Sequence, residues 1–292
     1  MKTSNYKRIA SGLSASALAL GLIAVAQDAM AAATSGTSVV NTRHNLSNTR
    51  ADSPGDIYVT NSPGGDGDIT QICVFCHTPH GADTTVPVPL WNKKTTGNTY
   101  TAYTMMGRDS MGTATVAGMS LACLTCHDGT QAMDVFMNAP GIHINGTDGT
   151  TQSAGYSWTG AGAVSDGADV VGGKLNGGRT NAALETGPIL GTDLSNDHPI
   201  GMTYCGKQPT AGTCDDWEAS NFVSPGSLST TIKIFGSARK GGGSGAGTGF
   251  ADSTNNGTVE CASCHNPHGT GNEALLRVTR EGSAICLACH IK

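Results

Sequence analysis

Four short stretches of the sequence share one pattern: a cysteine, two variable residues, a second cysteine and a histidine. They read Cys73-Val-Phe-Cys76-His77, Cys123-Leu-Thr-Cys126-His127, Cys261-Ala-Ser-Cys264-His265 and Cys286-Leu-Ala-Cys289-His290. Residues three apart lie on one side of a helical turn, so the two sulfurs of each stretch can reach a common partner. The spacing predicts a c-type haem held by two thioethers, with the histidine as proximal ligand of its iron.

The composition agrees with a fold that depends on such groups. Hydrophobic residues make up 38% of the chain and aromatic residues 5%, and there are 41 glycines. A core of side chains alone would be thin for this length. We therefore predict four covalently attached haem c groups, stacked, in a chain that is mostly coil. Short helices are expected only at the haem motifs, with a few short strands, for which the candidates are residues 168–171, 201–204 and 229–235.

The N-terminus has the pattern of a secretory signal peptide. A basic start with Lys2, Lys7 and Arg8 precedes an apolar run over 13–26, and Ala29-Met-Ala31 has the small-x-small form of a cleavage site. We predict a signal peptide over residues 1–31, with no membrane span after its removal. The expected location is secreted, extracellular or on the cell surface, with the periplasm as the alternative.

The charge balance points away from nucleic acid. Removing residues 1–31 deletes three of the 17 basic residues and one of the 22 acidic ones, which leaves 14 and 21, a net charge of −7. Haem propionates would add negative charge. An acidic surface is compatible with a cationic partner, a metal ion or a mineral.

The motifs alternate along the chain. The first and third continue as His77-Thr-Pro-His80-Gly and His265-Asn-Pro-His268-Gly, whereas the second and fourth do not. This order predicts an N-terminal dihaem module (32–137) and a C-terminal one (259–292), separated by a Gly/Ser/Thr-rich middle segment (138–258). In that segment Cys205 and Cys214 remain after the motifs are assigned, and in an exported protein they are expected to form a disulfide. Its glycine run at 240–249 lacks the ending of a phosphate-binding loop and is expected to be a flexible loop.

A six-coordinate haem needs a second axial ligand. Proline stops the helix before His80 and His268 and directs each imidazole away from its own haem, so we predict that both bind a neighbouring iron. His44, His143 and His198 are the other candidates, and spacing does not separate them. Methionine is the competing ligand type; the candidates are Met105, Met106, Met111, Met119, Met133, Met137 and Met202. Closed axial positions favour electron transfer over catalysis, so we assign no catalytic residue. Zinc, which also binds cysteine and histidine, fits a fifth-position histidine in an exported protein less well.

Several stretches together resemble the doubled-CxxCH multihaem cytochromes. That family includes tetrahaem outer-surface cytochromes of metal-reducing microbes, some of which polymerise into extracellular filaments. The stretches are Arg43-His-Asn-Leu-Ser47, Ile72-Cys-Val-Phe-Cys-His-Thr-Pro-His-Gly81, Pro89-Leu-Trp-Asn92, Leu124-Thr-Cys-His-Asp-Gly-Thr130, Asn196-Asp-His-Pro-Ile-Gly201, Cys264-His-Asn-Pro-His-Gly-Thr270 and Leu275-Leu-Arg277.

The resemblance implies two histidine ligands for every haem. It favours His44, His80, His198 and His268 as distal ligands, leaves His143 aside, and makes His44 the candidate for a ligand that crosses a subunit boundary. It also implies a homopolymer that passes electrons to partner cytochromes or to extracellular metal or mineral acceptors. A monomeric periplasmic carrier is the first alternative, and a multihaem oxidoreductase is the second.

Overall fold

The computed structural model describes most of the sequence around the haem motifs. The described residues are 38–50, 57–61, 69–104, 114–116, 118–138, 152–153, 156–158, 168–171, 173–177, 189–205, 214, 220–229, 231–236, 257–269 and 272–292. The expected signal peptide, His143 and the glycine run at 240–249 lie outside them.

The chain is mostly coil, as predicted, and every α-helix among the described residues lies at a haem motif. The motifs carry η3 (Cys73–Phe75), α2 (Gly118–His127), α3 (Cys261–Cys264) and α4 (Ala284–Leu287). Single 3-10 turns occur elsewhere, at η1 (Val39–Asn41), η2 (Asn48–Arg50), η6 (Pro225–Ser227), η7 (Glu273–Leu275) and η8 (Glu281–Ser283). None of the helices in the described part is long and apolar enough to cross a membrane.

Short antiparallel strand pairs make up the small sheets. They are β1 (Val59–Asn61) with β4 (Ser157–Trp158), β2 (Val135–Phe136) with β3 (Gln152–Ser153), β5 (Ala168–Val171) with β6 (Lys174–Gly177), and the sheet of β7 (Met202–Thr203), β9 (Gly257–Val259) and β8 (Phe235–Gly236) in the order β7-β9-β8.

The strand predictions succeed only in part. Residues 168–171 form β5, and β7 lies within 201–204. Of 229–235, only the last residue is in a strand. A turn takes the start of that segment: the Ile232 amide donates to the Ser229 carbonyl at 3.0 Å, and the Thr231 amide donates to the Ser229 hydroxyl at 3.3 Å. Side chains that bond their own backbone in this way compete with strand pairing.

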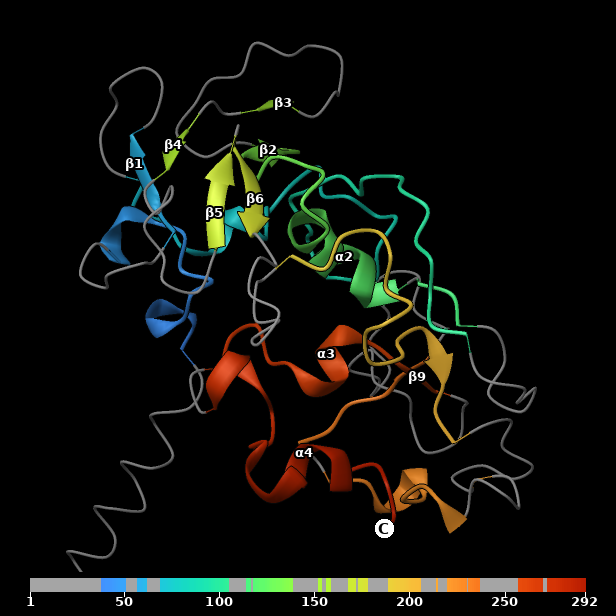
Figure 1. Cartoon of the computed structure of the whole chain (residues 1–292). Coiled ribbons are helices and arrows are strands. Elements are labelled where there is room, and N and C mark those ends of the chain that lie inside the picture. Colours follow the sequence, from blue (N-terminus) through green and yellow to red (C-terminus); the bar gives the residue numbers. More distant parts are fainter. Residues whose placement is uncertain are drawn as a thin grey trace, which may run out of the picture.

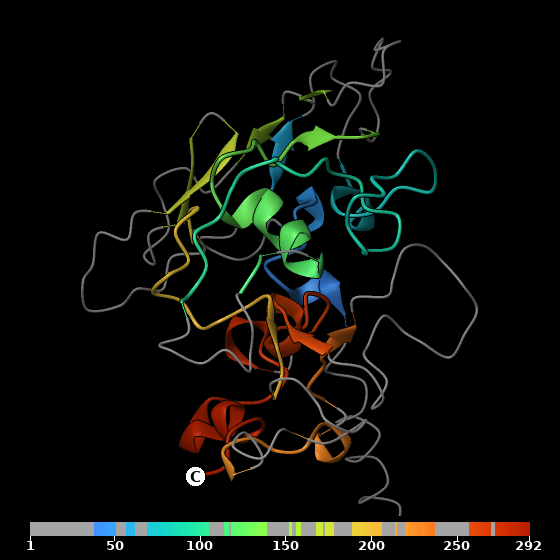
Figure 2. The ribbon, with the colours of Figure 1, turned by 90° about the vertical axis from the view of Figure 1, so that its right-hand side faces the viewer.

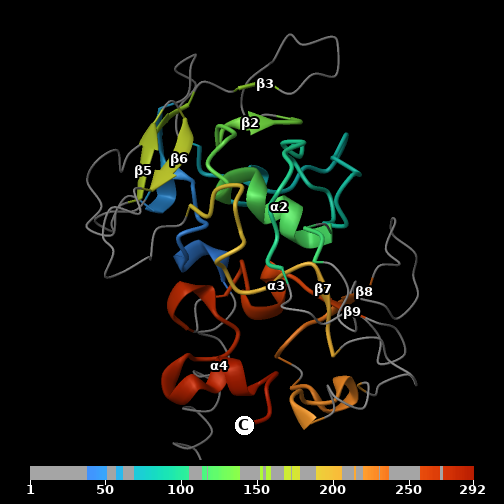
Figure 3. The ribbon, with the colours of Figure 1, turned by 45° about the vertical axis from the view of Figure 1, so that its right-hand side comes forward.

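The motif helices follow one another through the molecule. Figures 1 and 3 show α2 near the middle, α3 beside it, and α4 next to the C-terminus at the far end; Figure 2 gives the same order from the side. The strands β1, β2, β5 and β6 gather at the opposite end from α4 (Figure 1). The helices α2, α3 and α4 therefore follow one another from the strand-rich end of the molecule toward the C-terminus.

An aromatic cluster anchors the first motif. Phe75, one of its two variable residues, is fully buried and packs edge-on against Phe136 and Tyr156 at ring-centroid distances of 5.9 and 6.4 Å. Val59 and Ile69 complete the buried set. Since Cys73 and Cys76 flank this side chain in sequence, packing of Phe75 fixes where their sulfurs lie.

A second cluster surrounds a disulfide between Cys205 and Cys214, whose Cα atoms are 5.0 Å apart. The cluster also contains Tyr204 and Ile234. The Tyr204 hydroxyl donates to the carbonyls of Val223 and Cys289, at 2.7 and 3.2 Å. The disulfide region is thus tied directly to the fourth motif.

Replacing both Cys205 and Cys214 by alanine is expected to lower the free energy of unfolding by about 2–3 kcal/mol, since the loop they close is short. The fourth motif should suffer first because Tyr204 bonds the Cys289 carbonyl. Amide hydrogen exchange of the haem-loaded variant measures this directly. Protection unchanged at 286–290 would show that the disulfide acts only locally.

Candidate haem sites

Each CxxCH motif forms one helical turn. The amide of the motif histidine donates to the carbonyl of the first cysteine, at 2.8 Å from His77 to Cys73, 3.0 Å from His265 to Cys261 and 2.8 Å from His290 to Cys286. The second motif lies within α2. This turn places both cysteines and the histidine of a motif on neighbouring positions, which is the arrangement that the spacing predicts.

The chemistry of the cysteines fits thioether attachment. Both cysteines of every motif are free thiols, whereas the remaining pair is joined as a disulfide; the eight free ones are Cys73, Cys76, Cys123, Cys126, Cys261, Cys264, Cys286 and Cys289. Two thiols and an imidazole on one helical turn are the groups that hold a c-type haem. The residues present therefore fit the cofactor.

Backbone carbonyls fix the proton on several histidine rings. The Nδ1 atoms of His77, His265, His44 and His198 lie 2.7, 2.8, 3.0 and 3.1 Å from the carbonyls of Pro89, Ala274, Pro267 and Pro199. A carbonyl can only accept, so Nδ1 carries the hydrogen and Nε2 keeps its lone pair. This tautomer binds a metal through Nε2, with the carbonyl orienting the ring.

Two pairs of histidine rings have the separation that one iron between them would require. The ring centroids of His77 and His268 are 6.1 Å apart, and those of His44 and His127 are also 6.1 Å apart. With metal–nitrogen bonds of about 2 Å and each centroid about 1.1 Å behind its nitrogen, two imidazoles on opposite sides of one metal have centroids about 6 Å apart. Both pairs join a motif histidine to one of the predicted distal ligands.

A third pair lies at the C-terminal end. His290 packs against Phe222 with ring centroids 4.7 Å apart. Its pKa is lowered, mainly by burial and then by the nearby charge of His198. The charge of His198, predicted as a distal ligand, therefore acts on the histidine of the fourth motif.

Burial favours the neutral form of the two predicted distal ligands in these pairs, which is the form that binds a metal. It lowers the pKa of His44 to about 4, with the neighbouring His127 as the second cause. The pKa of His268 is lowered by burial and by His77. His44, the candidate for a ligand across a subunit boundary, therefore lies beside a motif histidine of its own chain.

The first and third motifs share a return loop. Each motif histidine forms an isolated antiparallel bridge with a later residue, Trp91 for His77 and Leu276 for His265. The residue before each bridge partner, Leu90 or Leu275, has a left-handed backbone, with φ of 54° and 59°. Such φ values are uncommon outside glycine, so their recurrence marks a structural repeat.

The same loops also form hydrogen bonds to the backbone of the motifs. The Asn92 side chain donates to the Val74 carbonyl at 2.6 Å, and Arg277 Nε donates to the Ala262 carbonyl at 2.8 Å. Val74 and Ala262 occupy the same position in their motifs. Asn92 and Arg277 thus make equivalent hydrogen bonds in the two motifs. The sequences Pro89-Leu-Trp-Asn92 and Leu275-Leu-Arg277 do not reveal this equivalence.

Asn138 holds the turn that carries His80. Its Nδ2 donates to the His80 carbonyl at 2.5 Å and to the Thr78 hydroxyl at 3.1 Å. Gly81 follows with φ of 59°, and a Cβ there would lie 3.3 Å from Asn138 Nδ2. His80 itself is exposed.

Asp128, directly after His127, is a buried carboxylate with a full set of donors. Its Oδ2 accepts from the Tyr100 hydroxyl at 2.7 Å and from Asn98 Nδ2 at 2.9 Å, and its Oδ1 accepts from the amide and hydroxyl of Thr130 at 2.8 and 2.9 Å. Burial raises the pKa of Tyr100 to about 12. This network fixes the chain that leaves the second motif.

Two buried polar groups lie near the first motif. Lys93 Nζ donates to the Met133 carbonyl at 2.5 Å and lies 4.3 Å from the centre of the Phe136 ring. Trp91 Nε1 is buried without a hydrogen-bond partner, and its ring lies edge-on to His77 at 6.2 Å. A cation and a spare N–H donor beside a motif histidine are groups that can meet the anionic propionates of a haem.

The described residues contain no group of three or more His, Cys, Asp or Glu side chains placed to hold a bare metal ion. Four of the histidines form two ring pairs instead, His77 with His268 and His44 with His127. Met133 and Met202 are buried and Met119 and Met137 are half-buried in the described part, whereas the candidates Met105, Met106 and Met111 lie outside it.

Comparison with known proteins supports haem binding at the C-terminal pair of motifs. Residues 254–292 match the family model described as "Doubled CXXCH motif". This stretch contains Cys261-Ala-Ser-Cys264-His265 and Cys286-Leu-Ala-Cys289-His290. Comparison with curated proteins finds no match. The chain thus carries a doubled haem-attachment motif of the kind found in multihaem c-type cytochromes.

Proposed function

We propose that the chain is a secreted tetrahaem c-type cytochrome that carries electrons along haems with two histidine ligands each. The observation that carries this proposal is the pairing of His77 with His268 and of His44 with His127, at 6.1 Å in both cases. The haem-attachment match at residues 254–292 supports it independently.

We assign the distal ligands of the first two motifs from the ring distances, and that of the fourth from the influence of His198 on the charge of His290. His268 serves the first motif, His44 the second and His198 the fourth. His80 and the motif histidine His265 remain, so we assign His80 to the third motif by elimination. The Pro-His-Gly histidines of the first and third motifs are then exchanged between the two modules, so that each module completes the other.

The chain's part in the chemistry is to close the iron positions and fix their spacing. When bound, haem supplies an iron that cycles between Fe(III) and Fe(II) without making bonds to a substrate. Two imidazoles per site leave no position for a reactant, and this favours electron transfer over catalysis.

The attachment cysteines follow one another in space. Among the causes that raise the pKa of Cys76 is the nearby Cys126. A hydrogen bond between the Cys123 and Cys261 thiols is the largest cause of the raised pKa of Cys123. The pKa of Cys264 is raised by burial, then by Cys261 and Cys286. These interactions link the motifs in order from the first to the fourth, which supports the proposed electron path.

We further propose that the secreted chain polymerises into an extracellular filament and passes electrons to cytochromes or to metal and mineral acceptors. The signal-peptide pattern, the net charge of −7 after its removal and the family resemblance support this part. Exposed Leu287 and Ile291 beside the fourth motif place apolar surface at one end of the row.

Intact-mass analysis of the secreted protein, with its visible spectrum, tests the haem proposal. We expect the mass of the chain without residues 1–31 plus four haems, and a low-spin spectrum. A mass with two haems would leave only the C-terminal pair of motifs in use. Electron cryomicroscopy of the same sample tests polymerisation: ordered fibres are expected, and discrete particles would leave a soluble carrier.

A further inference from the structure

A buried carboxylate lies between the second and third motifs. Glu260 directly precedes Cys261 and is 4% exposed. It packs against the start of α2, where Gly118 has φ of +58°, and a Cβ at Gly118 would lie 3.3 Å from Glu260 Oε1. The glycine thus allows the helix of the second motif to approach this acid closely.

Hydroxyl groups from two elements meet the Glu260 carboxyl. Ser120 of α2, itself fully buried, donates to Oε2, and Thr258 of β9 donates to Oε1 at 2.9 Å. The Ser120 hydroxyl also accepts from the Cys261 amide at 3.1 Å. Ser120 and Glu260 therefore join the two motifs through a shared polar contact.

The charged surroundings of Glu260 are simple. The cysteines that face it are Cys123 on α2 and Cys261 on α3, both of which interact with its charge as free thiols. In the haem-loaded protein their sulfurs are thioethers and do not titrate. From β9 it faces only the Thr258 hydroxyl, and no cation is among the groups that shift it. Burial raises the pKa of Glu260, and the hydroxyls of Ser120 and Thr258 oppose that effect.

We propose that Glu260 is a redox-linked protonation site, which takes up a proton when the haems attached at Cys123 and Cys261 are reduced and releases it when they are oxidised. The inference rests on the proposed electron-transfer function. The nearest proposed iron ligand along the chain from Glu260 is His265, five residues later in sequence, whereas the attachment residue Cys261 directly follows Glu260.

The balance and the sign follow from Coulomb's law. An external reductant supplies one electron to an Fe(III) site, and solvent supplies one proton to the Glu260 carboxylate, so the net charge of the region is unchanged. Added negative charge disfavours a nearby carboxylate and raises its pKa. Proton uptake therefore accompanies reduction, and the potentials of the two haems fall as pH rises.

Spectroelectrochemistry of the haem-loaded protein at several pH values tests the proposal. In the wild type, the reduction potentials of some haems should change with pH. The change is at most about 59 mV per tenfold change in proton concentration for one proton per electron. In Glu260→Gln those potentials should become independent of pH. An infrared difference spectrum should show a protonated carboxyl band on reduction, and this band should be absent from Glu260→Gln.

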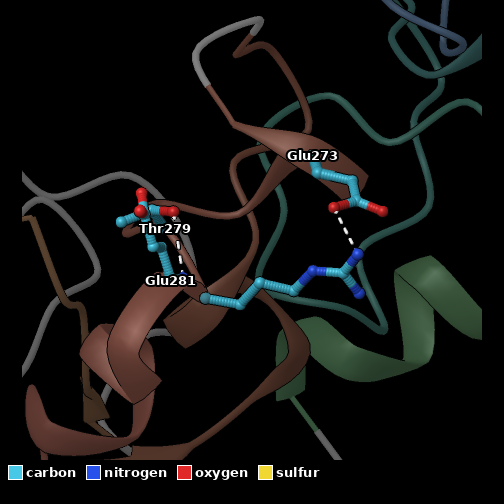
Figure 4. A network of polar contacts seen from close by, with 4 residues as sticks. Glu273, Thr279 and Glu281 are labelled. Atoms are coloured by element: carbon cyan, nitrogen blue, oxygen red, sulfur yellow. Dashed lines mark hydrogen bonds and ion pairs between the residues drawn. The ribbon is translucent and has the colours of Figure 1, made fainter.

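Two further variants separate charge from structure. Glu273→Gln removes the same charge from an exposed side chain, which pairs with exposed Arg280 in the loop between the third and fourth motifs (Figure 4), and should keep the wild-type pH dependence. Ser120→Ala keeps the acid but removes a donor that lowers its pKa, so the pH dependence should move to higher pH.

The outcomes are distinct. A Glu260→Gln protein with the wild-type pH dependence and the carboxyl band overturns the inference while leaving the cytochrome intact. A protein that takes up no haem overturns the proposed function instead. If Glu260→Gln does not accumulate, Ser120→Ala decides: an unshifted pH dependence rejects Glu260 as the site.

Discussion

His268→Ala is expected to convert one haem of four from six-coordinate low-spin to five-coordinate high-spin. The ring of His268 faces His77, with centroids 6.1 Å apart. Loss of His268 should therefore open the haem attached at Cys73 and Cys76, and not the haem attached at the nearer motif in sequence, Cys261 and Cys264. Visible and electron paramagnetic resonance spectra of the ferric protein measure the high-spin fraction, and the ferrous protein should bind one carbon monoxide per chain.

His143→Ala is the matched control, since the proposed ligand set does not use His143, and it should keep four low-spin haems. A second comparison identifies the haem that is opened. In a Cys73→Ala/Cys76→Ala background, which lacks the first haem, His268→Ala should add no high-spin signal. A new high-spin signal there would assign His268 to another haem and reject the exchange of ligands between the modules.

Asp128→Ala is expected to lower the free energy of unfolding by about 3–5 kcal/mol, because it leaves buried donors without an acceptor. The carboxylate accepts from Tyr100, Asn98 and Thr130, and its loss frees the chain that follows the second motif. Denaturant unfolding of the haem-loaded protein, followed by fluorescence and by the haem band, measures the change.

Asp193→Ala is the comparison for this variant. Asp193 is exposed and accepts mainly from the Ser195 amide two residues away, so its unfolding midpoint should match the wild type. If Asp128→Ala has the same unfolding midpoint as Asp193→Ala, the hydrogen bonds around Asp128 form as a result of folding and do not stabilise the second motif.

The helical turns at the motifs could be predicted from sequence because they are local. Two cysteines and a histidine within five residues leave one compact arrangement for binding a common partner, and the structure has it at all four motifs. The pairing of His77 with His268 could not be predicted in this way. Nothing in the spacing relates them, since their contact depends on how the N-terminal and C-terminal segments pack.

The supporting contacts were hidden for a different reason. The carbonyls of Pro89 and Ala274 orient His77 and His265, and a backbone carbonyl leaves no mark on residue type. Glu260 and Asp128 do adjoin motif residues in sequence, which is a signal that could have drawn attention to them. Their burial, however, depends on α2 and on residues 96–100, which approach only in the folded chain.

The contact between His77 and His268 also means that the first motif can be completed only after the C-terminal segment has been synthesised. His268 is made about 190 residues after His77, which takes roughly 10–40 s at 5–20 residues per second. Before His268 is made, the iron of a haem attached at the first motif would have only one histidine ligand from its own chain. If His268 is the second ligand of the first haem, as proposed above, a product truncated before residue 268 would carry an incompletely ligated haem at its first motif.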